Sequence, residues 1–389
     1  MKILHVISSG GMYGAEAVIL NMSRMMNEGP NRSLLGVFQN FSNSNVQLHE
    51  QAIQEGIESH LIPCRGQVDR AAVIRIRELV AQTGVDVVHA HGYKADIYVY
   101  LAMRSSRIPF VSTCHNWLDN DRKASLYGFL DRWTLRRYAR IVAVSADVRQ
   151  RLLKAGVDAK RISMIRNGID LRPFDHAPAL LKHELGWTAC LLVGLAGRLS
   201  FEKGVDIFLH AAARVLAQLP DAKFVVAGDG PEQAALDALI NELGIRASVR
   251  MLGRRTDMPS FYASLDVLVS SSRTEGLPIG ILEAMASRLP LVATPVGEIP
   301  TLIEDGRTGM LAAVENQESL AEAIVVLLRN PERREQLGAA ARQRVEDEFS
   351  AARMTADYLR VYEDALAAVA IKKDDRRREV PDAPRGETK

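Results

Sequence analysis

The sequence predicts an α/β protein built from two doubly wound domains, each with a mainly parallel sheet. Short, apolar, β-rich runs alternate with longer stretches of helical period along most of the 389 residues. Several of these runs end in glycine or a small polar residue, as strands of a buried parallel sheet do. The alternation falls into two sets, and the length exceeds what one domain of ordinary size requires.

The expected strands are continuous apolar runs of four to six residues. In the first half they are Ile3–Ile7, Leu34–Phe38, Ser59–Pro63, Asp86–Ala90, Phe110–Cys114, Ile141–Val144 and Ile162–Ile165. In the second half they are Leu191–Ala196, Lys223–Ala227, Val249–Leu252, Val267–Ser271 and Leu291–Thr294. Helices are expected between the strands, and two more over Gln317–Arg329 and Glu332–Glu348.

A break near residues 167–190 separates the two sets, since it contains two prolines and a turn-like Asn-Gly. We therefore expect one Rossmann-like domain over residues 1–175 and another over 186–350. A last helix is expected over 351–370. The charged stretch 371–389 is expected to be a mobile tail, because it has almost no apolar content.

Composition excludes several classes of protein. With 47% hydrophobic and 25% charged residues the chain is not disordered. Three scattered cysteines without a CxxC pair argue against a disulfide framework and a thiolate zinc site. No apolar run has the length of a membrane helix, and MKILHVISSGG does not resemble a signal peptide. We therefore expect a cytoplasmic protein.

The charge is unevenly distributed, although the net charge is only +2. Residues 1–185 carry 24 Lys and Arg against 17 Asp and Glu, so the first half is basic and the second acidic. This asymmetry is compatible with an anionic partner. No aromatic stacking platform or nucleic-acid motif accompanies it, so we expect no nucleic-acid partner.

Ligands of parallel sheets bind at the carboxyl ends of the strands, so the residues that follow each strand are the candidates. Ser8–Gly14 (SSGGMYG) follows the first strand and precedes a helix, which allows backbone N–H groups to face an anion. GRLSFEKGVD places Gly197, Arg198 and Lys203 after the first strand of the second half. Two cations beside a helix start suit a diphosphate. The plainer alternatives are a tight turn and two solvated surface charges.

Glu275 and Glu283 lie eight residues apart around the start of a helix. Two turns of helix separate the carboxylates by about 12 Å, too far for the paired acids of a hydrolase. They could instead accept hydroxyl groups from two parts of one long ligand, such as a sugar and a ribose joined by a diphosphate. Alternatively, Glu275 caps the helix and Glu283 forms a surface ion pair.

Taken in order, these motifs resemble glycosyltransferase family 4. The pattern includes GGMYGAE, DVVHAHG, STCHN, VAVS and NGID in the first half, and GRLSFEKGVD, GDGP and EGLPIGILEAMA in the second. The resemblance extends to about residue 350. It implies a GT-B fold, in which two Rossmann-like domains, for acceptor and donor, face each other across a cleft. It also implies transfer of a sugar from a nucleotide sugar with retention at the anomeric carbon.

Carried over by position, the resemblance assigns a role to each candidate. Arg198 and Lys203 would bind the donor diphosphate, and Glu275 would contact sugar hydroxyls. His115 in STCHN matches the active-site histidine near the donor sugar. The implied donor-binding residues are Gly11, Gly197, Gly228, Arg254, Gly276, Leu277 and Glu283. Among them, Gly11 would approach the diphosphate and Glu283 would hold the ribose. Gly276 and Leu277 would offer backbone N–H groups to the donor sugar.

The chain departs from the family at Pro278, where the common pattern is Glu-Gly-Phe-Gly, so one backbone N–H is missing. For His89 and His91 a structural role is as plausible as a functional one, and His5 is expected in the core. The DxD at Asp119-Asn120-Asp121 is interpreted as a turn, not as a metal site. The basic helix expected over 122–140 either packs on the sheet or lies on an anionic membrane.

The sequence thus predicts a retaining, metal-independent glycosyltransferase without a cofactor. Its donor is a nucleotide sugar, with UDP or GDP favoured, and its acceptor is a saccharide or lipid-linked, as in polysaccharide or glycolipid biosynthesis. A membrane contact would place it at the inner face of the cytoplasmic membrane. The rivals are another GT-B enzyme, such as an epimerase or phosphorylase, and a non-catalytic sugar-nucleotide-binding module.

Overall fold

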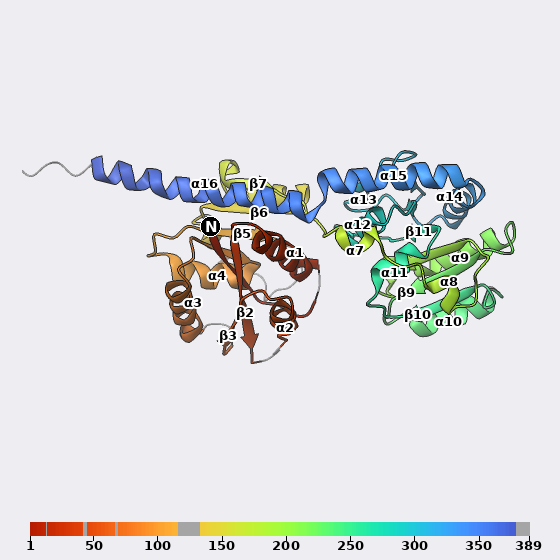
Figure 1. Cartoon of the computed structure of the whole chain (residues 1–389), viewed down its shortest axis with the longest axis horizontal. Coiled ribbons are helices and arrows are strands. Elements are labelled where there is room, and N and C mark those ends of the chain that lie inside the picture. Colours follow the sequence, from red (N-terminus) through yellow and green to blue (C-terminus); the bar gives the residue numbers. More distant parts are fainter. Residues whose placement is uncertain (13, 42–44, 67–68, 116–132, 379–389) are drawn as a thin grey trace, which may run out of the picture. The chain divides into compact units, whose positions relative to one another are not determined.

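The structure is a computed structural model that describes residues 1–378 except 13, 42–44, 67–68 and 116–132. The chain divides into two compact units (Figure 1). Unit 1 consists of Met1–Gly168 and Ala351–Lys389, and unit 2 consists of Ile169–Ser350. The DxD sequence and most of the expected basic helix 122–140 lie outside the described residues.

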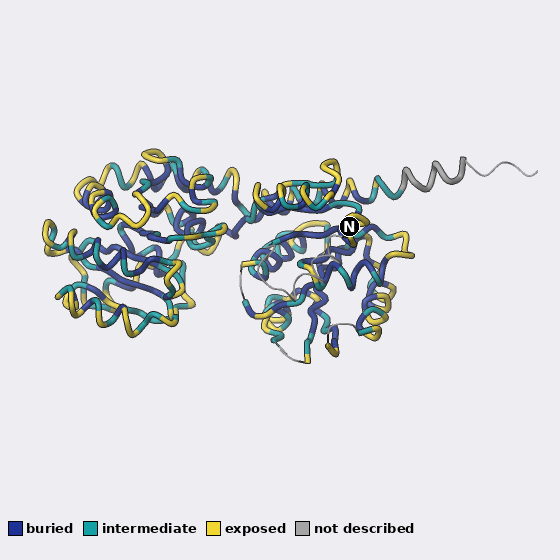
Figure 2. The backbone as a smooth tube through the Cα atoms, turned by 180° about the vertical axis from the view of Figure 1, so that it is seen from behind, coloured by how far each residue is buried: buried dark blue, intermediate teal, exposed yellow. Residues whose placement is uncertain are grey.

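Unit 1 contains a parallel sheet of seven described strands in the order β3-β2-β1-β4-β5-β6-β7. The strands are β1 (Lys2–Ile7), β2 (Arg32–Asn40), β3 (Ser59–Cys64), β4 (Val87–His91), β5 (Phe110–Cys114), β6 (Arg140–Ala143) and β7 (Ile162–Met164). The edge strands β3 and β7 are partly exposed, whereas β1, β4 and β5 are almost wholly buried (Figure 2). This burial explains why they have continuous apolar runs instead of an alternating pattern.

Helices cover both faces of this sheet. Alternate residues of β1 point to opposite faces: Leu4 and Val6 pack with α3 (Arg70–Thr83), α4 (Tyr93–Met103) and α6 (Ala146–Lys154). Ile3 and Ile7 face α1 (Gly14–Glu28), α2 (Gln47–Gln54) and α16 (Ala351–Arg378). The C-terminal helix α16 therefore completes the core of the unit that contains the N-terminus (Figure 1).

Unit 2 contains a second parallel sheet, with the described order β10-β9-β8-β11-β12-β13. Its strands are β8 (Leu192–Ala196), β9 (Lys223–Ala227), β10 (Val249–Gly253), β11 (Val267–Ser270), β12 (Leu291–Ala293) and β13 (Met310–Leu311). On one face lie α9 (Val205–Leu216), α10 (Gln233–Glu242) and α14 (Gln317–Arg329). On the other lie α8 (Leu181–Glu184), α11 (Met258–Ala263), α12 (Ile279–Ala286), α13 (Ile299–Leu302) and α15 (Pro331–Glu348).

The predicted fold class is confirmed, and every expected strand is present to within two residues at either end. Two details differ. Strand β13 was not predicted, since a strand of two residues has no periodic pattern. Helix α16 continues to Arg378, eight residues beyond the expected end of the last helix at residue 370. Its Lys and Arg residues favour helix, and no glycine or proline interrupts it before Pro381.

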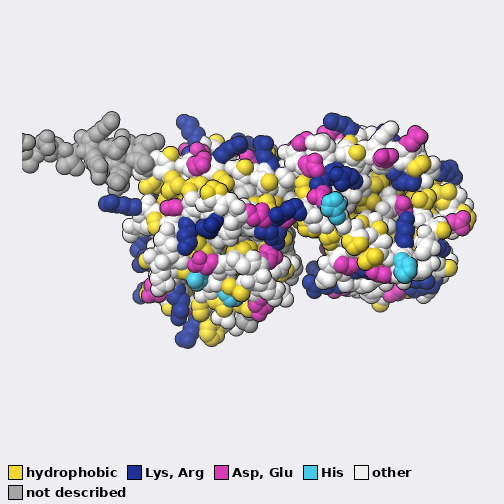
Figure 3. Space-filling model, viewed as in Figure 1, with side chains coloured by type: hydrophobic (Ala, Val, Ile, Leu, Met, Phe, Trp, Pro, Cys, Tyr) yellow, Lys and Arg dark blue, Asp and Glu magenta, His cyan; other side chains and the backbone are white. Residues whose placement is uncertain are grey.

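The stretch near residues 167–190, which was expected to separate the two domains, contains two short helices, α7 (Arg172–Asp175) and α8. Within the described ranges, no helix combines the length and apolarity needed to cross a bilayer. Basic and acidic side chains are interspersed on the face of the molecule shown in Figure 3.

Candidate functional site

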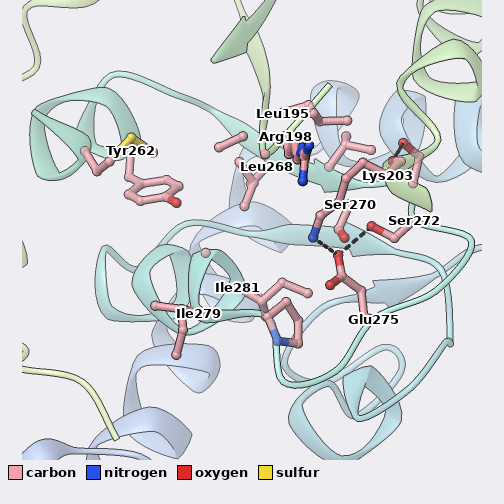
Figure 4. A pocket seen from close by; sticks show the side chains of 17 residues that line it. Leu195, Arg198, Lys203, Tyr262, Leu268, Ser270, Ser272, Glu275, Ile279 and Ile281 are labelled. Carbon is pink, nitrogen blue, oxygen red and sulfur yellow. Dashed lines mark hydrogen bonds and ion pairs between the residues drawn. The ribbon is translucent and has the colours of Figure 1, made fainter. Parts of the chain in front are cut away.

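Unit 2 has a cavity of about 270 Å³ at the carboxyl ends of β8 and β11 and beside the start of α12. Predicted residues that line it are Gly197, Arg198, Lys203 and Glu275. These residues, which are up to 78 positions apart in the numbering, therefore meet at one edge of one sheet (Figure 4). This is the edge where parallel sheets bind ligands.

The loop after β8 is shaped so that Lys203 reaches the cavity. A single 3₁₀ turn, Phe201–Lys203, leads into Gly204, which has a φ of 61°. A Cβ atom at Gly204 would lie 2.2 Å from the carbonyl oxygen of Ser271, so glycine is required there. Arg198 lies in the same loop, where it is exposed to solvent and lines the cavity.

Lys203 and Glu275 form an ion pair inside the cavity. Lys203 Nζ lies 2.6 Å from Glu275 Oε1, and the Ser272 hydroxyl donates to the same oxygen at 2.7 Å (Figure 4). The Glu275 side chain is only 9% exposed, and that of Lys203 is 30% exposed. Lys203, which was predicted to bind the diphosphate, and Glu275, which was predicted to bind the sugar, thus neutralise each other. The alternative that Glu275 caps α12 is wrong, because Pro278 occupies the N-cap position.

Arg273 braces the two loops that carry the ion pair. Its guanidinium donates to both carboxylate oxygens of Asp206 at 2.9 and 2.8 Å, and to the carbonyl oxygen of Phe201 at 2.8 Å. It also lies 4.1 Å from the centroid of the Phe201 ring. Hydrogen bonding to Asp206 raises the pKa of Arg273, so its guanidinium stays charged at all ordinary pH values.

The Glu275 loop packs on a glycine that the sequence analysis did not single out. Gly297 has a φ of 56°, and a Cβ atom there would lie 1.9 Å from the Glu275 carbonyl oxygen. Gly276 is exposed, and Leu277 packs partly on the core of unit 2. Within the described residues neither Gly276 nor Leu277 has a hydrogen-bond partner for its N–H. Both N–H groups are therefore available to a ligand, as the resemblance implies.

Glu283 lies on α12 but is not among the residues that line the cavity. Its Oε2 accepts the hydroxyl of Tyr262 at 2.9 Å, and Tyr262 itself does line the cavity. Burial raises the pKa of Glu283, and the hydrogen bond from Tyr262 opposes that shift. Burial and the Glu283 charge raise the pKa of Tyr262, so its hydroxyl remains a donor.

Two further predicted residues of unit 2 also lie outside the lining. Gly228 is a packing residue: a Cβ atom there would lie 1.8 Å from the Gly197 carbonyl oxygen. Arg254 follows β10 and is exposed. Their roles in donor binding stay predictions.

Gly11 and His115 belong to unit 1. Gly11 is buried in the loop after β1, and its N–H donates weakly to Ser9 Oγ at 3.3 Å. His115 directly follows β5, and its Nε2 lies 3.1 Å from His91 Nδ1. Burial lowers the pKa of His115 to about 4, so its ring is neutral at neutral pH.

Two family models match the chain. "Glycosyltransferase Family 4" matches residues 14–172, and "Glycosyl transferases group 1" matches residues 191–344. The alpha-D-kanosaminyltransferase of Streptomyces kanamyceticus is 31% identical over 65% of this chain and 71% of its own length. The chain belongs to glycosyltransferase family 4.

Two other relatives have different substrates in their names. The N-acetyl-alpha-D-glucosaminyl L-malate synthase of Bacillus anthracis is 27% identical over 83% of this chain and 85% of its own length. The UDP-Gal:alpha-D-GlcNAc-diphosphoundecaprenol alpha-1,3-galactosyltransferase of Escherichia coli is 27% identical over 66% of this chain and 70% of its own length.

The fold agrees with a solved structure, that of Anabaena HepE in complex with UDP. It is similar with a TM-score of 0.81 and 23% identity, over 93% of this chain and 100% of that one. The GT-B fold predicted from the motifs is thereby confirmed. As a member of this family, the protein is a glycosyltransferase that uses a nucleotide-sugar donor and retains the configuration at the anomeric carbon.

Sequence reasoning missed four residues that support the site: Ser272, Arg273, Tyr262 and Gly297. Ser272 and Arg273 stand beside Glu275 in the strand-end sequence SSSRTE, so proximity in sequence could have indicated them. Tyr262 and Gly297 are separated from the motifs and reach the site through the fold alone.

Proposed function

We propose that the enzyme binds a UDP-linked sugar in the unit 2 cavity and transfers the sugar to a saccharide or lipid-linked acceptor. The observation that carries the proposal is that Arg198, Lys203 and Glu275 line one cavity. UDP is supported by HepE, which was solved with UDP, and by the Escherichia coli relative named for UDP-Gal. The name of that relative also supports a lipid-linked acceptor, a sugar on diphosphoundecaprenol.

The ion pair between Lys203 and Glu275 suggests how the site accepts the donor. The incoming diphosphate offers Lys203 a more highly charged partner than one carboxylate. Once Lys203 moves to the phosphates, Glu275 retains the hydroxyl of Ser272 at 2.7 Å and gains room to accept sugar hydroxyls. Binding one end of the donor thus frees the residue that binds the other end.

The chemical step needs neutralisation of a leaving group. As the bond between the anomeric carbon and the diphosphate oxygen breaks, negative charge grows on that oxygen, and Arg198 and Lys203 stabilise it. The acceptor oxygen bonds to the anomeric carbon from the same face. Its proton passes to the departing phosphate oxygen, so the products are the glycosylated acceptor and UDP.

We further propose that Gly11, His115, Glu283, Gly228 and Arg254 contribute to donor binding as the family pattern implies. The N-terminal domain would bind the acceptor. Contact of the basic segment 122–140 with an anionic membrane belongs to the same proposal. A co-sedimentation assay in which the protein fails to bind anionic vesicles would remove the membrane contact alone.

Calorimetric titration tests the nucleotide. We expect UDP to bind, GDP and ADP to bind at least about tenfold more weakly, and R198A to lose most of the UDP affinity. Product analysis with and without acceptor tests the reaction class. Epimerisation or phosphorolysis of UDP-sugar without acceptor would favour another GT-B enzyme, and absence of any turnover alongside normal UDP binding would favour a binding module.

A further inference from the structure

Four histidines lie together on one face of the unit 1 sheet. His5 on β1 is in register with His89 on β4, and His91 follows two residues later. His115 comes directly after β5, the neighbour of β4. Two of the four, His89 and His91, come from the motif DVVHAHG, which the proposed reaction does not use.

Three of these rings form a hydrogen-bonded chain. His5 Nδ1 lies 3.0 Å from His91 Nε2, and His91 Nδ1 lies 3.1 Å from His115 Nε2. The ring planes of successive members are inclined by 30° and 25°, so the three rings lie nearly parallel. Both nitrogens of His91 are therefore committed to its two neighbours.

His89 belongs to a separate network. Its Nδ1 lies 2.8 Å from the Tyr362 hydroxyl on α16, and its Nε2 lies 2.8 Å from Thr113 Oγ1. His5, His89 and His91 are close enough together to be considered as metal ligands. However, every ring nitrogen of His89 and His91 already has a hydrogen-bond partner, so we interpret the cluster as two hydrogen-bond networks.

The chain must be made of neutral rings. Burial lowers the pKa of His5 to about 3 and that of His115 to about 4, and burial and the other histidines lower the pKa of His91 well below its usual value. A neutral imidazole has one N–H and one lone pair. Each bond in the chain needs one of each, so the direction of one bond fixes the direction of the other. The tautomers of the three rings are therefore coupled to one another.

The two ends of the chain are unpaired. His5 Nε2 and His115 Nδ1 are buried and have no hydrogen-bond partner among the described residues. His5 is in the middle of β1 and is 0% exposed. His115 instead lies at the carboxyl end of β5, the edge where parallel sheets bind their ligands. The nitrogen left to meet a ligand is therefore His115 Nδ1.

We infer that His91 is a positioning residue for glycosyl transfer. It occupies Nε2 of His115, fixes the tautomer and orientation of that ring, and leaves Nδ1 as the atom that contacts the donor sugar. This inference rests on the proposed function of His115 and deepens it. His5 supports the arrangement by holding the far side of the His91 ring.

A matched pair of substitutions tests the inference. The amide of asparagine reaches the position of the imidazole Nδ1, and that of glutamine reaches the position of Nε2. H91N therefore keeps the bond to His115 and loses the bond to His5, whereas H91Q does the reverse. Each variant removes one buried hydrogen bond, so comparison of the two corrects for a general loss of stability.

The first readout is nitrogen NMR of the His115 ring, which reports the tautomer directly. We expect one tautomer in the wild type, and two exchanging tautomers in H91Q, in which His115 Nε2 has lost its partner. The second is kinetic: H91Q should raise the KM for UDP-sugar about tenfold, while the affinity for UDP alone stays unchanged, because His115 contacts the sugar. H91N, which keeps the bond to His115, should raise the KM less than H91Q does.

Two results would overturn the inference, and the spectra distinguish them. Two tautomers of His115 in the wild type, or one in H91Q, would show that His91 does not fix this ring. Mixed tautomers in H91Q with an unchanged KM would show that His115 does not contact the donor, which would refute the proposed role of His115 itself. The wild-type spectrum alone decides the first point if both variants fail to fold.

Discussion

Acid should destabilise unit 1 through its buried histidines. Burial lowers the pKa of His5 from 6.5 to about 3, and burial and neighbouring histidines lower those of His89 and His91 well below 6.5. The unfolded chain then binds more protons than the folded one, so stability present above pH 6.5 is lost as the pH falls toward the folded pKa values. Between pH 7 and pH 5 the loss is about 2 kcal/mol for each neutral histidine.

Together with His115, whose pKa burial lowers to about 4, four such residues give a loss of roughly 8 kcal/mol, which is comparable with the whole stability of an ordinary domain. The assay is urea unfolding followed by tryptophan fluorescence in a W187F background. The tryptophans that remain, at positions 117 and 133, both belong to residues 1–168, so the fluorescence reports unit 1. We expect unit 1 to unfold at much lower urea concentration at pH 5 than at pH 7.

Substitutions identify the source of the loss. H89Q removes one buried imidazole and should shrink the loss between pH 7 and pH 5 by about 2 kcal/mol. H60Q, which removes a histidine whose side chain is 41% exposed on β3, is the matched control for the loss of an imidazole. An unchanged loss in H89Q, or a loss below about 2 kcal/mol in the parent, would refute the account of neutral buried rings.

Three predictions concern the cavity. K203A should lower kcat by about 10²–10³-fold; turnover equal to that of the wild type would refute the diphosphate role. Donor binding should weaken on acidification as Glu283, whose pKa is raised by burial, gains a proton. Y262F removes a hydrogen bond that lowers the pKa of Glu283, so in this variant donor binding should weaken at a higher pH than in the wild type. A pH profile of donor binding that does not shift in Y262F would contradict this. G297A should impair UDP-sugar binding, because a Cβ atom there would lie 1.9 Å from the Glu275 carbonyl oxygen; normal binding would show that the loop tolerates the change.

The strands could be predicted from sequence because both sheets are covered on both faces. Residues 224–227 of β9, for example, are buried and apolar at every position, which makes such runs easy to recognise. The two residues of β13 and the end of α16 could not be located in the same way. A two-residue strand has no pattern, and the charged end of α16 has the composition of a solvated chain.

The candidate site was only partly accessible from sequence. Arg198, Lys203 and Glu275 follow strand ends, and parallel topology brings strand ends together. The ion pair between Lys203 and Glu275 depends on side-chain conformations that no spacing specifies. The same holds for Tyr262 beside Glu283, since a contact between residues 21 positions apart on two helices is set by helix packing.

The histidines illustrate the limit most clearly. A core role for His5 and a functional role for His115 are separate expectations from sequence. The structure instead connects the two residues through His91 in one hydrogen-bonded chain. Their connection depends on the order in which β1, β4 and β5 lie side by side, which is a property of the sheet and not of any one motif.

A crystal structure with bound UDP-sugar would address the donor assignment most directly. We predict that both phosphates lie within hydrogen-bond reach of Arg198 and Lys203, and that Lys203 Nζ has moved away from Glu275, which then accepts hydroxyl groups of the sugar. A diphosphate bound elsewhere on the protein, with the 2.6 Å contact between Lys203 and Glu275 still in place, would contradict the assignment.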